Sequence, residues 1–197
     1  MPLTTMVIIM LLILLFTGVF ERVQRSIRLP KYCLYYFLIC SAALYGFNAI
    51  IIPEIEINPS CLLVLISVST LAAYRNEKHS LMVIPVSMLL CVPTVLLNRL
   101  SEWSEPLMCL TAMLPALCVF TKRNVCFNLA VAAAAPVIAV LAGFIFDINN
   151  IGYGSVVLDY RVVDMQFIGM LSVCVATELK EYVLRHIHPR LKQRSEL

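Results

Sequence analysis

Seven long apolar stretches, separated by short charged turns, constrain the fold of this chain more than any other feature. Of its 197 residues 61% are hydrophobic and 14% are charged, whereas a soluble domain carries about 25% charged residues. Too little polar surface is left to cover a core in water, so the expected solvent is lipid. The stretches are 1–20, 32–53, 60–74, 80–98, 107–120, 124–146 and 165–177.

These stretches predict an all-α fold, a polytopic transmembrane helix bundle of about seven spans over residues 1–184, followed by a basic cytoplasmic tail at 185–197. The last stretch is short, so its helix must include Asp164 at its start or Glu178 at its end. Leu179, Tyr182 and Val183 continue one helical face, which predicts that this helix runs on until Pro189 stops it.

The basic residues predict the orientation of the bundle. The first twenty residues carry no charge and are followed by arginines, which is typical of an uncleaved first helix with its N-terminus outside and not of a signal peptide. With seven spans, only Arg99 and Arg161 face outward and the other 13 of the 15 basic residues are cytoplasmic, as the positive-inside rule requires. The predicted location is a bacterial-type plasma (inner) membrane, with the C-terminus in the cytoplasm.

The turns predicted to face outward are acidic. They carry seven carboxylates against two arginines, which are either solvated loop charges or a vestibule that attracts cations. The candidate substrate- or ion-binding residues are Asp147, Asp159, Arg161, Asp164 and Glu54.

A faint internal symmetry accompanies this charge pattern. Shifted by 105 residues, Ser67 and Val68 fall on Ser172 and Val173, and Glu54 falls on Asp159. The match predicts a 3+1+3 arrangement, in which two three-span units are joined by a linking span and a site lies between the halves.

The sequence offers little for metal, cofactor or nucleic-acid chemistry. None of the eight cysteines forms a C-x-x-C pair, and His186 with His188 makes at most half of a metal site. There is no H-E-x-x-H motif, and Gly152 and Gly154 are followed by no phosphate-binding context. We therefore predict no metal, no cofactor and no nucleic-acid partner.

Asp147 and Asp164 allow one catalytic interpretation. If the end of one helix and the start of the next bring them together, two carboxylates would share a proton, as in aspartyl-type intramembrane hydrolases. The alternative is that both aspartates cap helix ends at the membrane interface.

Residues 48–74 and 128–177, with Asp147 and Asp164 as matched acids, resemble an uncharacterised prokaryotic multi-pass membrane family, domain of unknown function 1614. Most of the glycines that this family places around its last aspartate are missing here, although Gly169 remains. The resemblance implies a multi-pass helical fold and no known activity.

The leading hypothesis is a non-enzymatic membrane component, either transporter-like or an assembly partner of a transporter. An aspartyl-type hydrolase that uses Asp147 and Asp164 is the second hypothesis, and a scaffold that recruits partners through the basic tail is the third. The expected partners are the lipid bilayer and either other proteins or further copies of this chain.

Overall fold

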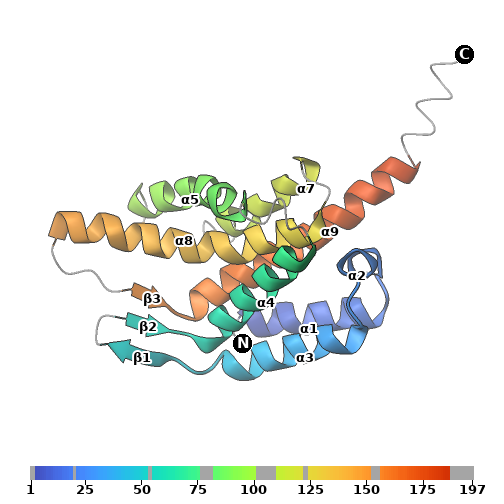
Figure 1. The fold of residues 1–197 in the computed structure, drawn as a ribbon, viewed down its shortest axis with the longest axis horizontal. Helices are drawn as coiled ribbons and strands as arrows, with labels where there is room; N and C mark the ends of the chain where they lie inside the picture. The colour runs from blue at the N-terminus through green and yellow to red at the C-terminus, as the bar shows by residue number, and fades with distance from the viewer. Residues whose placement is uncertain are drawn as a thin grey trace, which may run out of the picture.

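The computed structural model describes residues 3–19, 21–52, 55–75, 82–100, 110–121, 124–151 and 156–186, and most of them are helical. A small sheet lies at one end of the helices (Figure 1). The helices are α1 (Leu3–Phe16), α2 (Glu21–Ile27), α3 (Lys31–Leu44), α4 (Pro59–Arg75), α5 (Val83–Leu100), the 3-10 helix η2 (Leu114–Leu117), α7 (Cys118–Thr121), α8 (Val125–Ile151) and α9 (Tyr160–His186). The strands are β1 (Ala49–Ile52), β2 (Ile55–Ile57) and β3 (Val156–Leu158).

The predicted helical character of the chain is confirmed. Each of the seven apolar stretches contains helix, and two helical segments, Val125–Gly143 and Tyr160–Val183, are long and apolar enough to cross a membrane. The other apolar helices of the described residues are 10–17 residues long. The count of seven spans stays a prediction.

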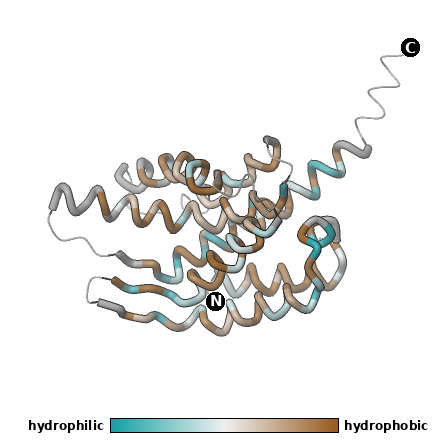
Figure 2. The backbone as a smooth tube through the Cα atoms, viewed as in Figure 1, coloured by the Kyte–Doolittle hydropathy of each residue, from teal (hydrophilic) through white to brown (hydrophobic). Residues whose placement is uncertain are grey.

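Helix α8 lies at the centre of the fold and packs against α4, α5 and α9. All residues from 125 to 137 are buried, because a run of four alanines allows neighbours to approach the helix closely from several sides. Helices α1, α3 and α4 run in alternating directions, as do α8 and α9 (Figure 1). Helix α2 and the end of α9 lie at the end opposite to the sheet, and hydrophilic residues are found both there and at the sheet (Figure 2).

The predicted span over residues 32–53 is wrong in its second half. Helix α3 ends at Leu44, and β1 pairs antiparallel with β2, which in turn pairs parallel with β3. Gly46 and Asn48 are poor helix formers, and the β-branched run Ile50–Ile52 favours a strand. The all-α expectation therefore missed a three-stranded sheet.

The boundaries of α8 and α9 also differ from the prediction. Helix α9 begins at Tyr160, so Asp164 lies in its second turn and not at its head. Helix α8 continues to Ile151, so Asp147 lies within this helix and not in the turn that follows it. The start of α9 is fixed by Asp159, whose side-chain Oδ1 accepts a hydrogen bond from the Arg161 N–H at 2.9 Å.

The sheet relates two strand–helix units, but not at the predicted offset. Ile57 of β2 pairs with Leu158 of β3, an offset of 101 residues, and each strand is followed by one residue and then a helix. Asn58 therefore lies next to Asp159, and its N–H donates to the Leu158 carbonyl at 2.8 Å. The correspondence is local and involves Asn58 in place of Glu54.

Gly169 of α9 lies at the closest contact among the glycines that the structure describes. A Cβ atom at this position would lie 3.0 Å from the carbonyl oxygen of Ala112 and 3.3 Å from the Cβ of Ala132. At Gly143 of α8, an added Cβ would meet nothing within 4 Å. Glycine at 169 thus permits close approach of three helices.

We expect Gly169→Ala to lower the free energy of unfolding by about 1–3 kcal/mol, because it overpacks this contact. Gly143→Ala is the matched control and should be neutral or slightly stabilising, because alanine is the better helix former. Thermal unfolding of the purified protein in detergent measures both. Equal melting temperatures for the two variants would contradict a close helix contact at Gly169.

Candidate functional site

The carboxylate of Asp164 joins α9 to two other segments of the chain. Its Oδ1 accepts hydrogen bonds from the backbone N–H of Thr4 at 2.8 Å, from the Thr4 hydroxyl, and from the Tyr45 hydroxyl at 3.1 Å. Thr4 lies in the first turn of α1 and is fully buried, while Tyr45 directly follows α3. One oxygen therefore holds three segments together.

The backbone of α1 explains why a carboxylate is suitable at this place. The first N–H groups of a helix have no partner within the helix, and the helix dipole makes this end partly positive. Asp164 supplies the missing acceptor from 160 residues away. Burial, together with the Asp164 carboxylate, raises the pKa of the Tyr45 hydroxyl, so this group stays protonated and donates.

The second carboxylate oxygen of Asp164, Oδ2, accepts no hydrogen bond from the residues that the structure describes. Within the same residues, no lysine or arginine forms an ion pair with this side chain. A partly buried charge without a positive partner is costly. The site can relieve this cost by binding a proton or a small cation at Oδ2.

Asn58 extends the polar contacts from Tyr45 to the sheet. Its fully buried side-chain Nδ2 donates to the Tyr45 carbonyl at 2.8 Å and to Asn48 Oδ1 at 3.1 Å, and its Oδ1 accepts from the Ser60 N–H at 2.9 Å. The last bond caps α4, which explains why the helix begins after Asn58. We call Thr4, Tyr45, Asn48, Asn58 and Asp164 the sheet-end polar cluster.

Asp159 and Arg161 have a structural role beside this cluster. Asp159 caps α9, and its Oδ2 lies 4.0 Å from the Nε of Arg161. The Arg161 guanidinium lies 5.9 Å from the ring centroid of Tyr160, whose ring packs edge-on against that of Tyr45 at 6.4 Å. The two residues border the cluster without contacting Asp164.

Asp147 and Asp164, the predicted pair, are not brought together. Gln166 Nε2 donates to the Ala133 carbonyl at 2.8 Å, which places these residues at the same level of the antiparallel helices α9 and α8 (Figure 1). Asp147 lies fourteen residues beyond Ala133, and Asp164 two residues from Gln166 in the same direction. At 1.5 Å per residue, the aspartates are about 18 Å apart along the helix axes. Glu54, Gly152 and Gly154 lie outside the described residues.

The sequence did not identify two buried amide side chains in the helix core, those of Gln166 and Asn128. Gln166 is fully buried, and its Nε2 bonds to α8 three residues before Pro136, whose missing N–H interrupts the hydrogen-bond ladder of that helix. Gln166 Oε1 and Asn128 Oδ1 are buried and accept no hydrogen bond from the described residues. For Gln166, the sequence signal was a single glutamine within the apolar stretch 165–177.

At its other end, α9 again bonds to the termini of neighbouring helices. Glu178 Oε1 accepts a hydrogen bond from the Val23 N–H of α2 at 3.3 Å, and Lys180 Nζ donates to the Val119 carbonyl of α7 at 2.6 Å. The Glu178 carboxylate thus lies at the start of α2, and the Lys180 ammonium binds a carbonyl of α7. The helix dipole favours both arrangements. Glu178 and Lys180 are structural groups in this arrangement.

No protein-family model, curated protein or solved structure matches the chain. The resemblance to domain of unknown function 1614 stays a prediction.

We expect Asp164→Ala to lower the free energy of unfolding by about 1–3 kcal/mol, because three donors lose their acceptor. Asp164→Asn keeps a carbonyl oxygen at Oδ1 and should lose less. Denaturant titration of the detergent-solubilised protein measures both, with Asp159→Asn as the control for a charge lost at the exposed end of α9. Equal losses for Asp164→Ala and Asp164→Asn would contradict the role of Oδ1 as an acceptor.

Proposed function

We propose that this chain is an integral plasma-membrane protein of seven spans, and that it acts there as a non-enzymatic, transporter-like component. The observation that carries the membrane assignment is the distribution of large apolar side chains. Phe16 of α1 is 83% exposed, Leu89 of α5 72% and Ile66 of α4 62%, while Gln166 and Asn58 are fully buried. Large exposed apolar patches on several helices suit lipid and not water.

The seven spans are proposed as α1, α3, α4, α5, the segment 110–121, α8 and α9. The five shorter helices fall below the roughly 20 residues that a bilayer core needs, so we propose that flanking residues and local thinning complete them. Alternating helix directions (Figure 1), and the exposed Arg25, Arg28 and Lys31 at the end opposite the sheet, support a cytoplasmic end at α2 and an outer end at the sheet. The two strand–cap–helix units support a repeated 3+1+3 plan.

The transporter-like activity is proposed to depend on Asp164. A carboxylate within a membrane-spanning helix, close to several hydroxyl and amide groups, is the usual kind of proton- or cation-binding group in transporters. Oδ1 is held by three donors, which leaves Oδ2 for the proton or cation. The carboxylates Asp147, Asp159 and Glu54 would attract cations toward the outer end of the bundle, and the positive charge of Arg161 would oppose this attraction.

The other two hypotheses receive less support. A hydrolase of the aspartyl type needs Asp147 and Asp164 in contact, and the helix geometry separates them by about 18 Å. A scaffold would act through the basic tail, of which residues 187–197 lie outside the described residues. Partner proteins and self-association remain part of the proposal for an assembly component.

Reporter fusions test the membrane topology. Alkaline phosphatase is active only on the outer side of the membrane, and green fluorescent protein fluoresces only on the cytoplasmic side. The reporter that gives a signal should therefore alternate along the chain. We expect outside signals after residues 55, 105 and 155 and inside signals after residues 78, 123 and 197. Two successive positions on the same side would contradict the seven-span count.

Infrared difference spectroscopy tests the role of Asp164. When the pH of reconstituted protein is changed, we expect the carbonyl band of a protonated carboxyl group in an apolar environment to appear or disappear. Asp164→Asn should remove this band, and the matched variant Asp159→Asn should retain it. A wild-type protein without such a band at any pH would exclude the proton-binding role, and carboxylate bands that also do not change when sodium ions are added would exclude the cation-binding role.

A further inference from the structure

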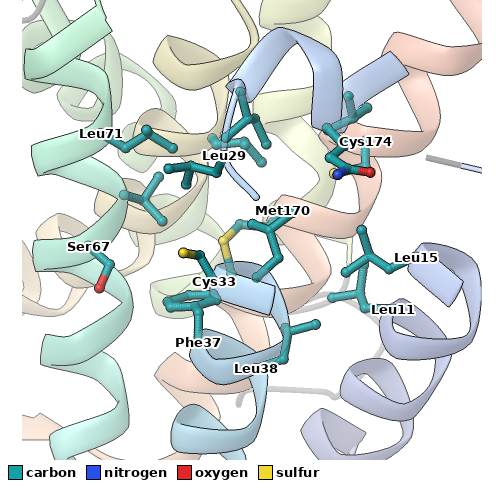
Figure 3. A pocket seen from close by; sticks show the side chains of 16 residues that line it. Leu11, Leu15, Leu29, Cys33, Phe37, Leu38, Ser67, Leu71, Met170 and Cys174 are labelled. Atoms are coloured by element: carbon teal, nitrogen blue, oxygen red, sulfur yellow. The ribbon is translucent and has the colours of Figure 1, made fainter. Parts of the chain in front are cut away.

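A second feature is an apolar cavity lined in part by α2, toward the end of the helices opposite to the sheet. It has a volume of about 290 Å³ and is lined by residues of α1, α2, α3, α4, α8 and α9. Leu11, Phe37, Leu71 and Met170 point into it from four of these helices (Figure 3). Among the described residues that line it, Gln24 and Ser67 are the uncharged polar ones, and none is charged.

The size and lining of the cavity suit part of a hydrocarbon chain. Its volume lies near the lower limit of small-ligand pockets, roughly 300 Å³, and its walls offer almost no hydrogen-bonding groups to a polar ligand. Helix α2 covers one side through Val23 and Ile27, which are 4% and 5% exposed. A flexible, apolar and narrow ligand is therefore the best chemical match.

Positive charges lie beside this cavity. Arg25, Arg28 and Lys31 are exposed, and in the chain they alternate with the lining residues Gln24, Ile27, Leu29 and Cys33. One carboxylate, that of Glu178, also lies at α2, where it accepts the Val23 N–H. The rim of an apolar cavity is thus basic, which is complementary to an anionic headgroup.

The backbone of Arg28 gives an independent reason to assign a role to its side chain. Its φ is +53°, and its N–H donates to the Gln24 carbonyl at 2.9 Å, so it ends α2 in the left-handed conformation. Glycine is the usual residue at this position, because other residues are strained there. An arginine in place of glycine indicates that the side chain contributes something other than the turn.

We propose that this cavity binds one acyl chain of an anionic phospholipid of the cytoplasmic leaflet, with the headgroup phosphate held by Arg28 and Lys31. This inference rests on the membrane location proposed above and is independent of Asp164. It assigns α2 a function as a lid between the acyl chain and the aqueous interface, where amphipathic helices with basic residues bind lipid.

Cysteine alkylation in the full-length wild-type protein tests the site. Cys33 lines the cavity, while Cys40 lies seven residues further along α3 and is exposed. The purified protein is placed in mixed micelles with phosphatidylglycerol or with phosphatidylcholine of the same acyl chains. N-ethylmaleimide modification of each cysteine is then followed by peptide mass spectrometry.

We expect phosphatidylglycerol to slow the modification of Cys33 at a lower mole fraction than phosphatidylcholine does, and neither lipid to change the rate at Cys40. Removing the charge at Arg28 or at Lys31 should weaken the preference for phosphatidylglycerol, roughly fivefold for each charge. Arg28→Gly is the sharpest variant, because it should relieve the strained backbone and keep the melting temperature in lipid-free micelles. Lys31→Gln removes a charge at a position where the backbone is not left-handed. Arg161→Gln, near the sheet, is the control and should not change the preference for phosphatidylglycerol.

Equal protection by the two lipids would overturn the anionic headgroup site, and the absence of protection by either would overturn the lipid site as a whole. Both outcomes leave the topology and the Asp164 infrared band untouched. Failure of this inference is therefore distinguishable from failure of the proposed function.

Discussion

The structure depends on one requirement, which is that helix ends inside an apolar environment need hydrogen-bond partners from other helices. Helix α9 supplies several of them. Asp164 accepts from the first turn of α1, Glu178 from the first turn of α2, and Lys180 donates to a carbonyl of α7. A buried backbone group without a hydrogen-bond partner is costly, so these side chains hold the N-terminal helices and α7 in place more firmly than apolar contact alone would.

At the sheet end, strands and capping side chains supply the hydrogen-bond partners of the helix ends. Helices α4 and α9 both start after a strand, and Asn58 and Asp159 cap them through the same kind of side-chain bond. Because β2 and β3 are paired, the two caps lie next to each other, and Asn58 is also bonded to the Tyr45 carbonyl. The sheet thus fixes the relative position of α4 and α9, and with it the position of Tyr45 beside Asp164.

The sequence was sufficient to predict where the helices lie, because long apolar stretches form the helices and charged residues gather in the turns between them. It was insufficient at Tyr32–Pro53, where hydropathy treats a buried helix and a buried strand alike. Asp164 was recognised as a candidate, but its partner Thr4 is 160 residues distant, and no local pattern predicts such a contact. Asp147 was paired with Asp164 because a turn was expected directly after Phe146, whereas α8 continues to Ile151.

The two proposed sites have opposite chemistry and lie along the same helix, α9, with Asp164 near its start and Met170 and Cys174 near its middle. Near its start, α9 carries a carboxylate whose Oδ2 accepts no bond from the described residues. Further along, Met170 and Cys174 face an apolar cavity. Gly169 lies between them, where α9 contacts α8 and the segment 110–113 so closely that a Cβ would meet a carbonyl at 3.0 Å. At 1.5 Å per residue, Met170 and Cys174 lie about 9 Å and 15 Å from Asp164 along the helix axis, so one helix presents a polar group and an apolar cavity wall within two to three turns.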